Sequence, residues 1–133
     1  MSFSDQETTG QTILVVEDEV MLRLDLSQQL RQGGFDVIEA DGADEAVALL
    51  ENTHIDAVVT DIRMPGDIDG RDLVVWVRRK IAKAKIVVVS AYVDPTWNLP
   101  ADVILPKPVR IEKLLQTLRQ ILPPGEHTGP GGS

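Results

Sequence analysis

Five short apolar runs, rich in β-branched residues, alternate along this chain with longer segments whose apolar residues recur with the period of a helix. The runs occupy residues 13–16, 35–38, 55–60, 86–89 and 103–105. In the last helical segment, isoleucine and leucine recur from Ile111 to Leu122 at the spacing of one helix face. Such alternation is typical of a parallel sheet whose strands are joined by crossover helices. The sequence therefore predicts an α/β fold with a five-stranded parallel sheet.

The segment between the fourth and fifth apolar runs departs from this alternation because it contains Pro95 and Pro100. Pro95 could begin a helical turn. Pro100 would end that turn almost at once, because proline lacks an amide hydrogen and clashes with the preceding turn. We therefore expect the fourth helix of the alternating pattern to be short or missing.

Length and composition indicate one folded domain. The chain has 133 residues, of which 43% are hydrophobic, and this is enough to bury a single core. Residues 1–10 are polar and are expected to form a flexible N-terminus, whereas residues 11–122 carry the periodic segments. Residues 123–133 are rich in glycine and proline, so we expect a disordered C-terminal tail.

Charge and residue usage exclude several classes of function. The net charge is −8, and a surface of this sign repels nucleic acid and anionic lipid, so we expect no direct binding to either. The absence of cysteine excludes disulfides, thiolate metal sites and cysteine nucleophiles. The sequence has no secretion signal and no apolar run near the roughly 20 residues that a membrane span needs. We expect a cytoplasmic protein.

Polar side chains follow four of the five apolar runs. Glu17 and Asp18 come directly after the first run, Asp61 after the third and Ser90 after the fourth, and Lys107 follows the fifth after one proline. The carboxyl ends of parallel strands share one edge of a sheet, which is where ligands bind in folds of this class. We expect these side chains to converge on one site.

Three carboxylates at one site would be destabilising unless they were protonated, screened or bridged by a cation. Two unit charges about 4 Å apart repel by roughly 4 kcal/mol at an effective dielectric near 20. All-oxygen ligation by few carboxylates suits Mg²⁺. Carboxylates with Mg²⁺ on one side, and Lys107 and Ser90 on the other, are the groups that phosphoryl transfer needs. Asp61 is the best nucleophile, because an aspartate can form an acyl phosphate and this one is central among the strand ends.

These motifs, in this order, resemble the CheY-like receiver domains of response regulators. The stretch 15–18 is similar to the acidic pair of that family, Asp61 with 64–66 to its phosphoacceptor loop, Ser90-Ala91 to its Ser/Thr motif, and 105–108 to its lysine motif. The resemblance covers about residues 11–122. It implies a stand-alone receiver domain with a flavodoxin-like, doubly wound sheet of strand order 2-1-3-4-5.

The resemblance also implies a role for each site residue. Asp61 would accept a phosphoryl group from a histidine kinase or phosphotransfer protein. Mg²⁺ would be bound directly by Asp18, Asp61 and the backbone carbonyl of Arg63, and by Glu17 either directly or through water. Ser90 and Lys107 would contact phosphoryl oxygens. The peptide bond between Lys107 and Pro108 would be cis. The domain would not be an enzyme beyond its own phosphorylation and dephosphorylation.

Three residues are expected to modulate this chemistry or its output. Arg63 and Tyr92 lie two residues after Asp61 and Ser90 respectively, where they could influence access to the phosphoryl group. Ile104 lies three residues before Lys107, where the family usually places the tyrosine or phenylalanine whose rotation reports phosphorylation. Aromatic switching is not possible at this position. Because the sequence indicates no DNA-binding or catalytic output domain, we expect either output through contact with an unidentified downstream protein or a role as a phosphate relay or sink.

Two alternatives remain open. The first is a pseudo-receiver, an interaction module that is not phosphorylated, which Ile104 and the shortened 91–102 segment suggest. The second is a Mg²⁺-dependent phosphatase or Toprim-like enzyme that uses an acidic cluster. Haloacid-dehalogenase-type phosphatases place an aspartate two residues after the nucleophile, where this chain has Arg63. Asp67 and Asp69 have the Asp-x-Asp spacing of Toprim domains but lie in a loop beyond the strand end.

Overall fold

A five-stranded parallel sheet forms the centre of the molecule, as predicted. The computed structural model describes residues 9–63, 69–91 and 98–123. The strands are β1 (Thr12–Val16), β2 (Asp36–Ala40), β3 (Ala57–Thr60), β4 (Lys85–Ser90) and β5 (Val103–Pro106). Their order in the sheet is β2-β1-β3-β4-β5, and every adjacent pair is parallel. This confirms the doubly wound topology.

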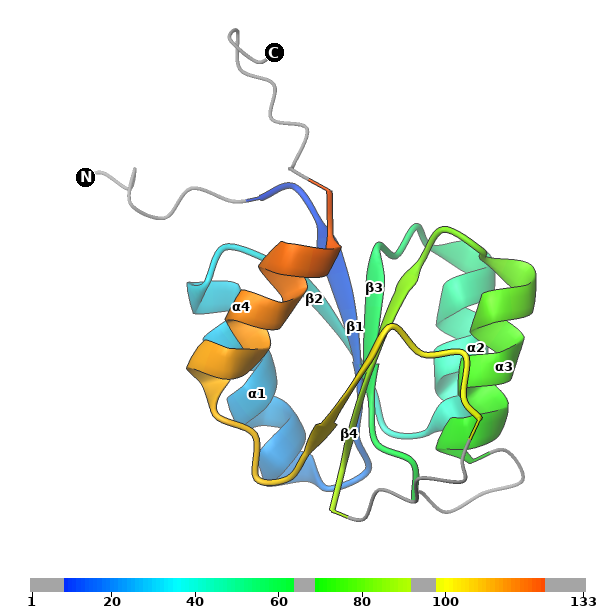
Figure 1. Ribbon diagram of the computed structural model, residues 1–133, viewed down its shortest axis with the longest axis horizontal. Helices are drawn as coiled ribbons and strands as arrows, with labels where there is room; N and C mark the ends of the chain where they lie inside the picture. The colour runs from blue at the N-terminus through cyan, green and yellow to red at the C-terminus, as the bar shows by residue number, and fades with distance from the viewer. Residues whose placement is uncertain (1–8, 64–68, 92–97, 124–133) are drawn as a thin grey trace, which may run out of the picture.

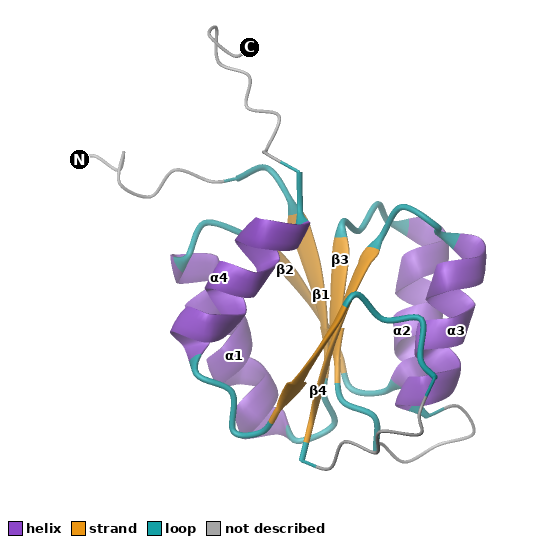
Figure 2. Ribbon diagram, in the orientation of Figure 1, coloured by secondary structure: helices purple, strands orange, loops and turns teal. Residues whose placement is uncertain are grey.

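In the described part of the chain, four helices cover the two faces of the sheet. They are α1 (Val20–Gln32), α2 (Ala43–Asn52), α3 (Gly70–Lys80) and α4 (Ile111–Ile121). Helices α1 and α4 lie on one face and α2 and α3 on the other (Figure 1). The three-layer arrangement is visible in Figure 2, where strands run between the two pairs of helices. Each face therefore buries its own apolar core.

The inner strands of the sheet are apolar because they are buried on both faces. All four residues of β3 are buried, as are four of the five residues of β1. A strand with helices on both sides has no solvent-facing side, so apolar residues run consecutively along it. Edge strand β2 carries the charged Glu39 and an exposed Asp36. The pattern of continuous apolar runs thus follows from parallel strands buried on both faces.

The connection from β4 to β5 is where we expected a short or missing helix, and residues 92–97 of it lie outside the described residues. Its described residues, 91 and 98–102, form no helix. Leu99 and Ala101 pack against the core beneath α2 and α3. Arg78 of α3 donates to the carbonyl of Pro100 at 3.1 Å and to Asp102 at 2.8 Å. Packing and these hydrogen bonds fix the described part of this connection to α3.

The ends of the folded region lie close together. The side chain of Gln11 donates a hydrogen bond of 2.7 Å to the carbonyl of Pro123. The expected flexible N-terminus and C-terminal tail fall almost entirely outside the described residues. Within those residues, no helix is long and apolar enough to cross a membrane.

Candidate functional site

The register of the strands gathers the predicted residues at the carboxyl edge of the sheet. Val16 pairs with Thr60 across β1 and β3, so the residues that follow them, Glu17 and Asp61, leave the sheet side by side. On the other side of β3, Ser90 pairs with Pro106 across β4 and β5. The amide of Lys107 donates to the carbonyl of Ser90 at 2.8 Å.

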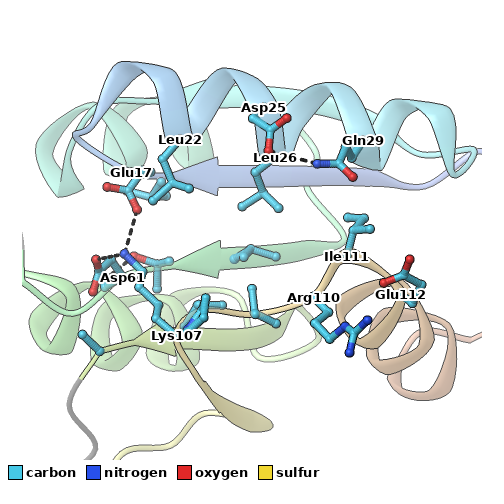
Figure 3. A pocket seen from close by; sticks show the side chains of 17 residues that line it. Glu17, Leu22, Asp25, Leu26, Gln29, Asp61, Lys107, Arg110, Ile111 and Glu112 are labelled. Atoms are coloured by element: carbon cyan, nitrogen blue, oxygen red, sulfur yellow. Dashed lines mark hydrogen bonds and ion pairs between the residues drawn. The ribbon is translucent and has the colours of Figure 1, made fainter.

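An ammonium group joins two of the predicted carboxylates. The Nζ atom of Lys107 lies 2.7 Å from Oδ2 of Asp61 and 3.2 Å from Oε1 of Glu17. Figure 3 shows the three side chains pointing toward one another from three different strand ends. The side chains of Glu17 and Asp61 are only 8% and 13% exposed, so water screens these ion pairs weakly.

Each of these carboxylates uses its two oxygens differently. Glu17 accepts the amide of Glu19 on Oε2 and Lys107 on Oε1. Asp61 accepts the amide of Ile62 on Oδ1 at 2.6 Å and Lys107 on Oδ2. One oxygen therefore holds the side chain in place against its own loop. The other faces the centre of the site, where a ligand could take over from the ammonium.

Burial and charge act against each other at these groups. Burial raises the pKa of Glu17, and the Glu19 amide and the Lys107 ammonium counteract only part of this rise. For Lys107, burial alone would lower the pKa, but the hydrogen bond and charge of Asp61, together with Glu17, raise it above its ordinary value. Lys107 thus remains an ammonium ion. Because burial disfavours the charged form of Glu17, a further cation nearby would stabilise its carboxylate.

The remaining predicted residues differ in their burial and contacts. Asp18 is exposed, and Arg63 is exposed with its amide 3.3 Å from Oδ1 of Asp61. Ser90 is buried at the end of β4. Ile104 packs against the core beneath α2 and α3. Tyr92 lies outside the described residues.

Two other expectations can be compared with the structure. The peptide bond between Lys107 and Pro108 is cis, as the resemblance implied. Asp69, one of the two aspartates of the Toprim alternative, caps α3 by accepting the amides of Arg71 and Asp72. Its carboxylate therefore stabilises the first turn of the helix. The other aspartate, Asp67, lies outside the described residues.

The donor set fits a magnesium ion with few protein ligands. In the described part of the chain, no three acidic, histidine or cysteine side chains gather closely enough to form a metal site by themselves. Glu17 and Asp61, however, both present an oxygen to the same cation, the Lys107 ammonium. Mg²⁺ usually retains several waters and binds one or two carboxylates. These two side chains could supply that minimum.

Sequence reasoning missed two residues that contact the backbone of Asp61 or Glu17. A Cβ atom added to Gly70 would overlap the carbonyl oxygen of Asp61 and lie 2.6 Å from Cα of Ile62. The first turn of α3 thus presses directly against the backbone of Asp61. Arg23 of α1 donates from Nη1 to the carbonyl of Glu17 at 2.8 Å. The Asp69-Gly70 pair signals a helix start, but neither contact has a signal in residue spacing.

A pocket of about 700 Å³ opens beside the charged group. Its wall is mainly apolar and runs between α1 and the segment that leads into α4 (Figure 3). Leu22 and Leu26 line it from α1, and Val109 and Ile111 line it from the other side. Glu17, Asp61 and Lys107 lie at one end of the pocket. Asp61 therefore lies at the end of a mainly apolar pocket.

Comparisons with known proteins show which family the chain belongs to. A sequence model of the family described as response regulator receiver domain matches residues 13–119. Sensor kinase CckA of Brucella abortus is 35% identical over 118 residues, which cover 84% of this chain and 12% of that protein. A response regulator receiver protein of Anaeromyxobacter sp. is 36% identical over 107 residues, covering 77% of this chain and 44% of that protein. The chain thus spans less than half of either relative.

Solved structures give the same result. The response regulator protein TrrA from Thermotoga maritima, crystallised in complex with Mg²⁺-BeF, superposes with a TM-score of 0.78 at 30% identity. The alignment covers 84% of this chain and 99% of that one. Fold, sequence and strand-end residues therefore agree, and this chain belongs to the response regulator receiver domains of two-component systems.

Proposed function

We propose that this chain accepts a phosphoryl group on Asp61 from the phosphohistidine of a histidine kinase or phosphotransfer protein, in a step that uses Mg²⁺. The observation that supports this most strongly is the orientation of Asp61. Backbone amides hold its Oδ1, while its Oδ2 faces the Lys107 ammonium at 2.7 Å. A carboxylate oriented in this way beside a fixed cation is arranged for attack on an electrophile that carries negative charge.

The proposed step needs one bond to form and one to break. A carboxylate oxygen of Asp61 attacks phosphorus, and the bond from phosphorus to the donor imidazole breaks, with its electron pair leaving on the imidazole nitrogen. Lys107 and the Ser90 hydroxyl would then stabilise negative phosphoryl oxygens. When bound, Mg²⁺ would supply further charge neutralisation, held by Glu17, Asp18, Asp61 and the carbonyl of Arg63.

The mainly apolar pocket gives the donor a route to Asp61. A phosphohistidine must bring its phosphorus into contact with the aspartate, so the donor protein has to cover the open side of the site. The wall formed by Leu22, Leu26 and Ile111 offers that protein an apolar surface next to the charged groups. Burying this surface would exclude water from the reacting atoms and strengthen their electrostatic interactions.

We further propose that output occurs through protein contact in the cytoplasm. Ile104 packs against the core, and an aliphatic side chain cannot provide an aromatic switch. Phosphorylation would instead shift the population of conformations that a downstream protein recognises. The domain would turn over no substrate other than its own phosphoryl group and would bind neither nucleic acid nor membrane directly.

Incubation with acetyl phosphate and Mg²⁺, followed by intact mass spectrometry, tests the proposed acceptor. The wild-type chain should gain one phosphoryl group and the Asp61→Asn variant none. Asp56→Asn is the matched control, because Asp56 follows α2 at the opposite end of the sheet and binds the amide of Thr12. It should label like wild type. Equal labelling of wild type and Asp61→Asn would contradict the proposal, and chelation of Mg²⁺ should abolish labelling of the wild-type chain.

A further inference from the structure

Arg23 connects the acidic loop of the site to the edge of the sheet. Its Nη1 donates to the carbonyl oxygen of Glu17 at 2.8 Å, and its Nε lies 3.2 Å from Oε1 of Glu39 on β2. The Arg23 side chain is 15% exposed and that of Glu39 is 21% exposed. The guanidinium therefore contacts a fixed carboxylate and the backbone of a site residue at the same time.

The structure assigns Arg23 as a positioning residue for Glu17, an inference that rests on the proposed function. It acts through the Glu17 backbone and touches no reacting atom. The amide of Glu17 donates to the carbonyl of Ala40 at 3.1 Å, so Arg23 completes the attachment of this residue at its carbonyl side. With both sides of the backbone attached, the Glu17 carboxylate is directed toward Lys107.

The planar guanidinium is suited to this task. Its nitrogens are held in a rigid fork, so binding Glu39 with one nitrogen fixes the direction in which another donates. The Glu39 carboxylate lies on a strand, and β2 pairs with β1 along five residue pairs. Arg23 thereby fixes the backbone of the loop that follows β1 relative to strand β2. A glutamine or lysine at this position could not maintain both contacts with the same geometry.

Arg31 provides an internal comparison on the same helix. It pairs with the second oxygen of Glu39 at 3.4 Å, and it donates to the carbonyl of Val37 on β2 at 3.0 Å. Both arginines thus pair α1 with the same carboxylate. Arg23 reaches the site, whereas the described contacts of Arg31 remain on β2. The two arginines also differ in burial, since the Arg23 side chain is 15% exposed and that of Arg31 is 49% exposed, so the comparison rests on Mg²⁺ affinity and not on stability.

The test compares Arg23→Gln with Arg31→Gln in a titration with Mg²⁺ alone, followed through backbone amide shifts of residues 16–19. Groups that orient metal ligands typically change metal affinity about 10- to 100-fold when removed, so we expect about tenfold weaker Mg²⁺ binding for Arg23→Gln. Arg31→Gln should bind Mg²⁺ like wild type. Urea unfolding should show that both variants are folded under the conditions of the titration. If Arg23→Gln does not fold, Arg23→Lys replaces it under the same criterion.

Equal Mg²⁺ affinity in the Arg23 and Arg31 variants would overturn the assignment. Labelling by acetyl phosphate at saturating Mg²⁺ separates this failure from that of the proposed function. A wild-type chain that is labelled on Asp61, together with an Arg23 variant of unchanged Mg²⁺ affinity, would refute only the role of Arg23. A wild-type chain that neither binds Mg²⁺ nor becomes labelled would refute both.

Discussion

Charged side chains at the two ends of the sheet have different partners. At the amino end of the strands, they complete backbone hydrogen bonds. Asp56 accepts the amide of Thr12 at 2.8 Å, and Asp102 accepts the amide of Ile86 at 2.7 Å. Arg78 donates to Asp102 and to three backbone carbonyls. These charges join strands and loops to each other.

At the carboxyl end of the strands, only one of the two oxygens of each carboxylate binds the backbone. Glu17 and Asp61 each give one oxygen to a nearby backbone amide and direct the other toward Lys107. A side-chain ion pair can be exchanged for a ligand without disturbing the strands, whereas a backbone hydrogen bond cannot. The difference separates groups that stabilise the fold from groups that are available for chemistry.

The comparison predicts opposite effects for aspartates at the two ends. Asp61→Asn should abolish labelling by acetyl phosphate and change the free energy of unfolding by less than about 1 kcal/mol, because relief of the repulsion between Asp61 and Glu17 offsets the loss of the ion pair with Lys107, and one oxygen still accepts the Ile62 amide. Asp102→Ala should leave labelling unchanged. It should lower the free energy of unfolding by about 1–3 kcal/mol, because the amide of Ile86 loses its partner.

Urea denaturation and intact mass spectrometry on the same two variants measure both effects. Loss of labelling in a stably folded Asp102→Ala variant would break the distinction between the ends. A destabilisation of Asp61→Asn as large as that of Asp102→Ala would also break it, because it would give Asp61 a structural role.

Gly70 should be more sensitive to substitution than Gly42, although both glycines lie at helix starts. An added Cβ at Gly70 would overlap the backbone of Asp61, whereas at Gly42 it would meet nothing within 4 Å. Overpacking of this kind typically costs about 1–3 kcal/mol. We therefore expect Gly70→Ala to lower the free energy of unfolding by that amount and to slow labelling of Asp61.

Gly42→Ala is the matched control for this substitution. The backbone of Gly42 is extended, with φ of −172°, so alanine is compatible with it. Its labelling rate should equal that of wild type. If the two alanine variants label equally fast, the close approach of α3 does not position Asp61.

The smallest expected effect concerns a hydroxyl group that belongs to neither end of the sheet. Ser27 of α1 is fully buried, and among the described residues its Oγ has no hydrogen-bond partner. Removing a buried, unsatisfied hydroxyl should raise the free energy of unfolding by about 1 kcal/mol in Ser27→Ala, with labelling unchanged. Gln28→Ala, at an exposed position of the same helix, should change stability by less than about 0.5 kcal/mol. A destabilised Ser27→Ala variant would show that the hydroxyl has a partner in solution.

The strand ends were predictable from sequence because two simple periodicities determine them. Continuous apolar runs give buried parallel strands, and the polar residue after each run must lie at the common edge. That reasoning brought Glu17, Asp61 and Lys107 together. It also grouped Asp18 with Glu17, although the structure buries the Glu17 side chain and exposes Asp18. Residue spacing alone does not show which of two neighbouring carboxylates is the more buried.

Contacts between elements were not predictable in this way. Arg23 reaches Glu17 because α1 packs at a particular height along β1, and Gly70 touches Asp61 because α3 begins against the end of β3. Arg78 likewise joins α3 to the connection before β5. Each contact depends on the relative position of two elements, which residue spacing within one element does not specify.

The central claim is that Asp61 is the phosphoacceptor, and the most direct measurement is the position of the phosphoryl group. After incubation with acetyl phosphate and Mg²⁺, borohydride reduction converts a phosphorylated aspartate to homoserine, and peptide mass spectrometry locates that residue. The account predicts homoserine at position 61 and unmodified residues at Glu17, Asp18 and Asp56. Homoserine at another aspartate, or none in a folded chain that binds Mg²⁺, would contradict it.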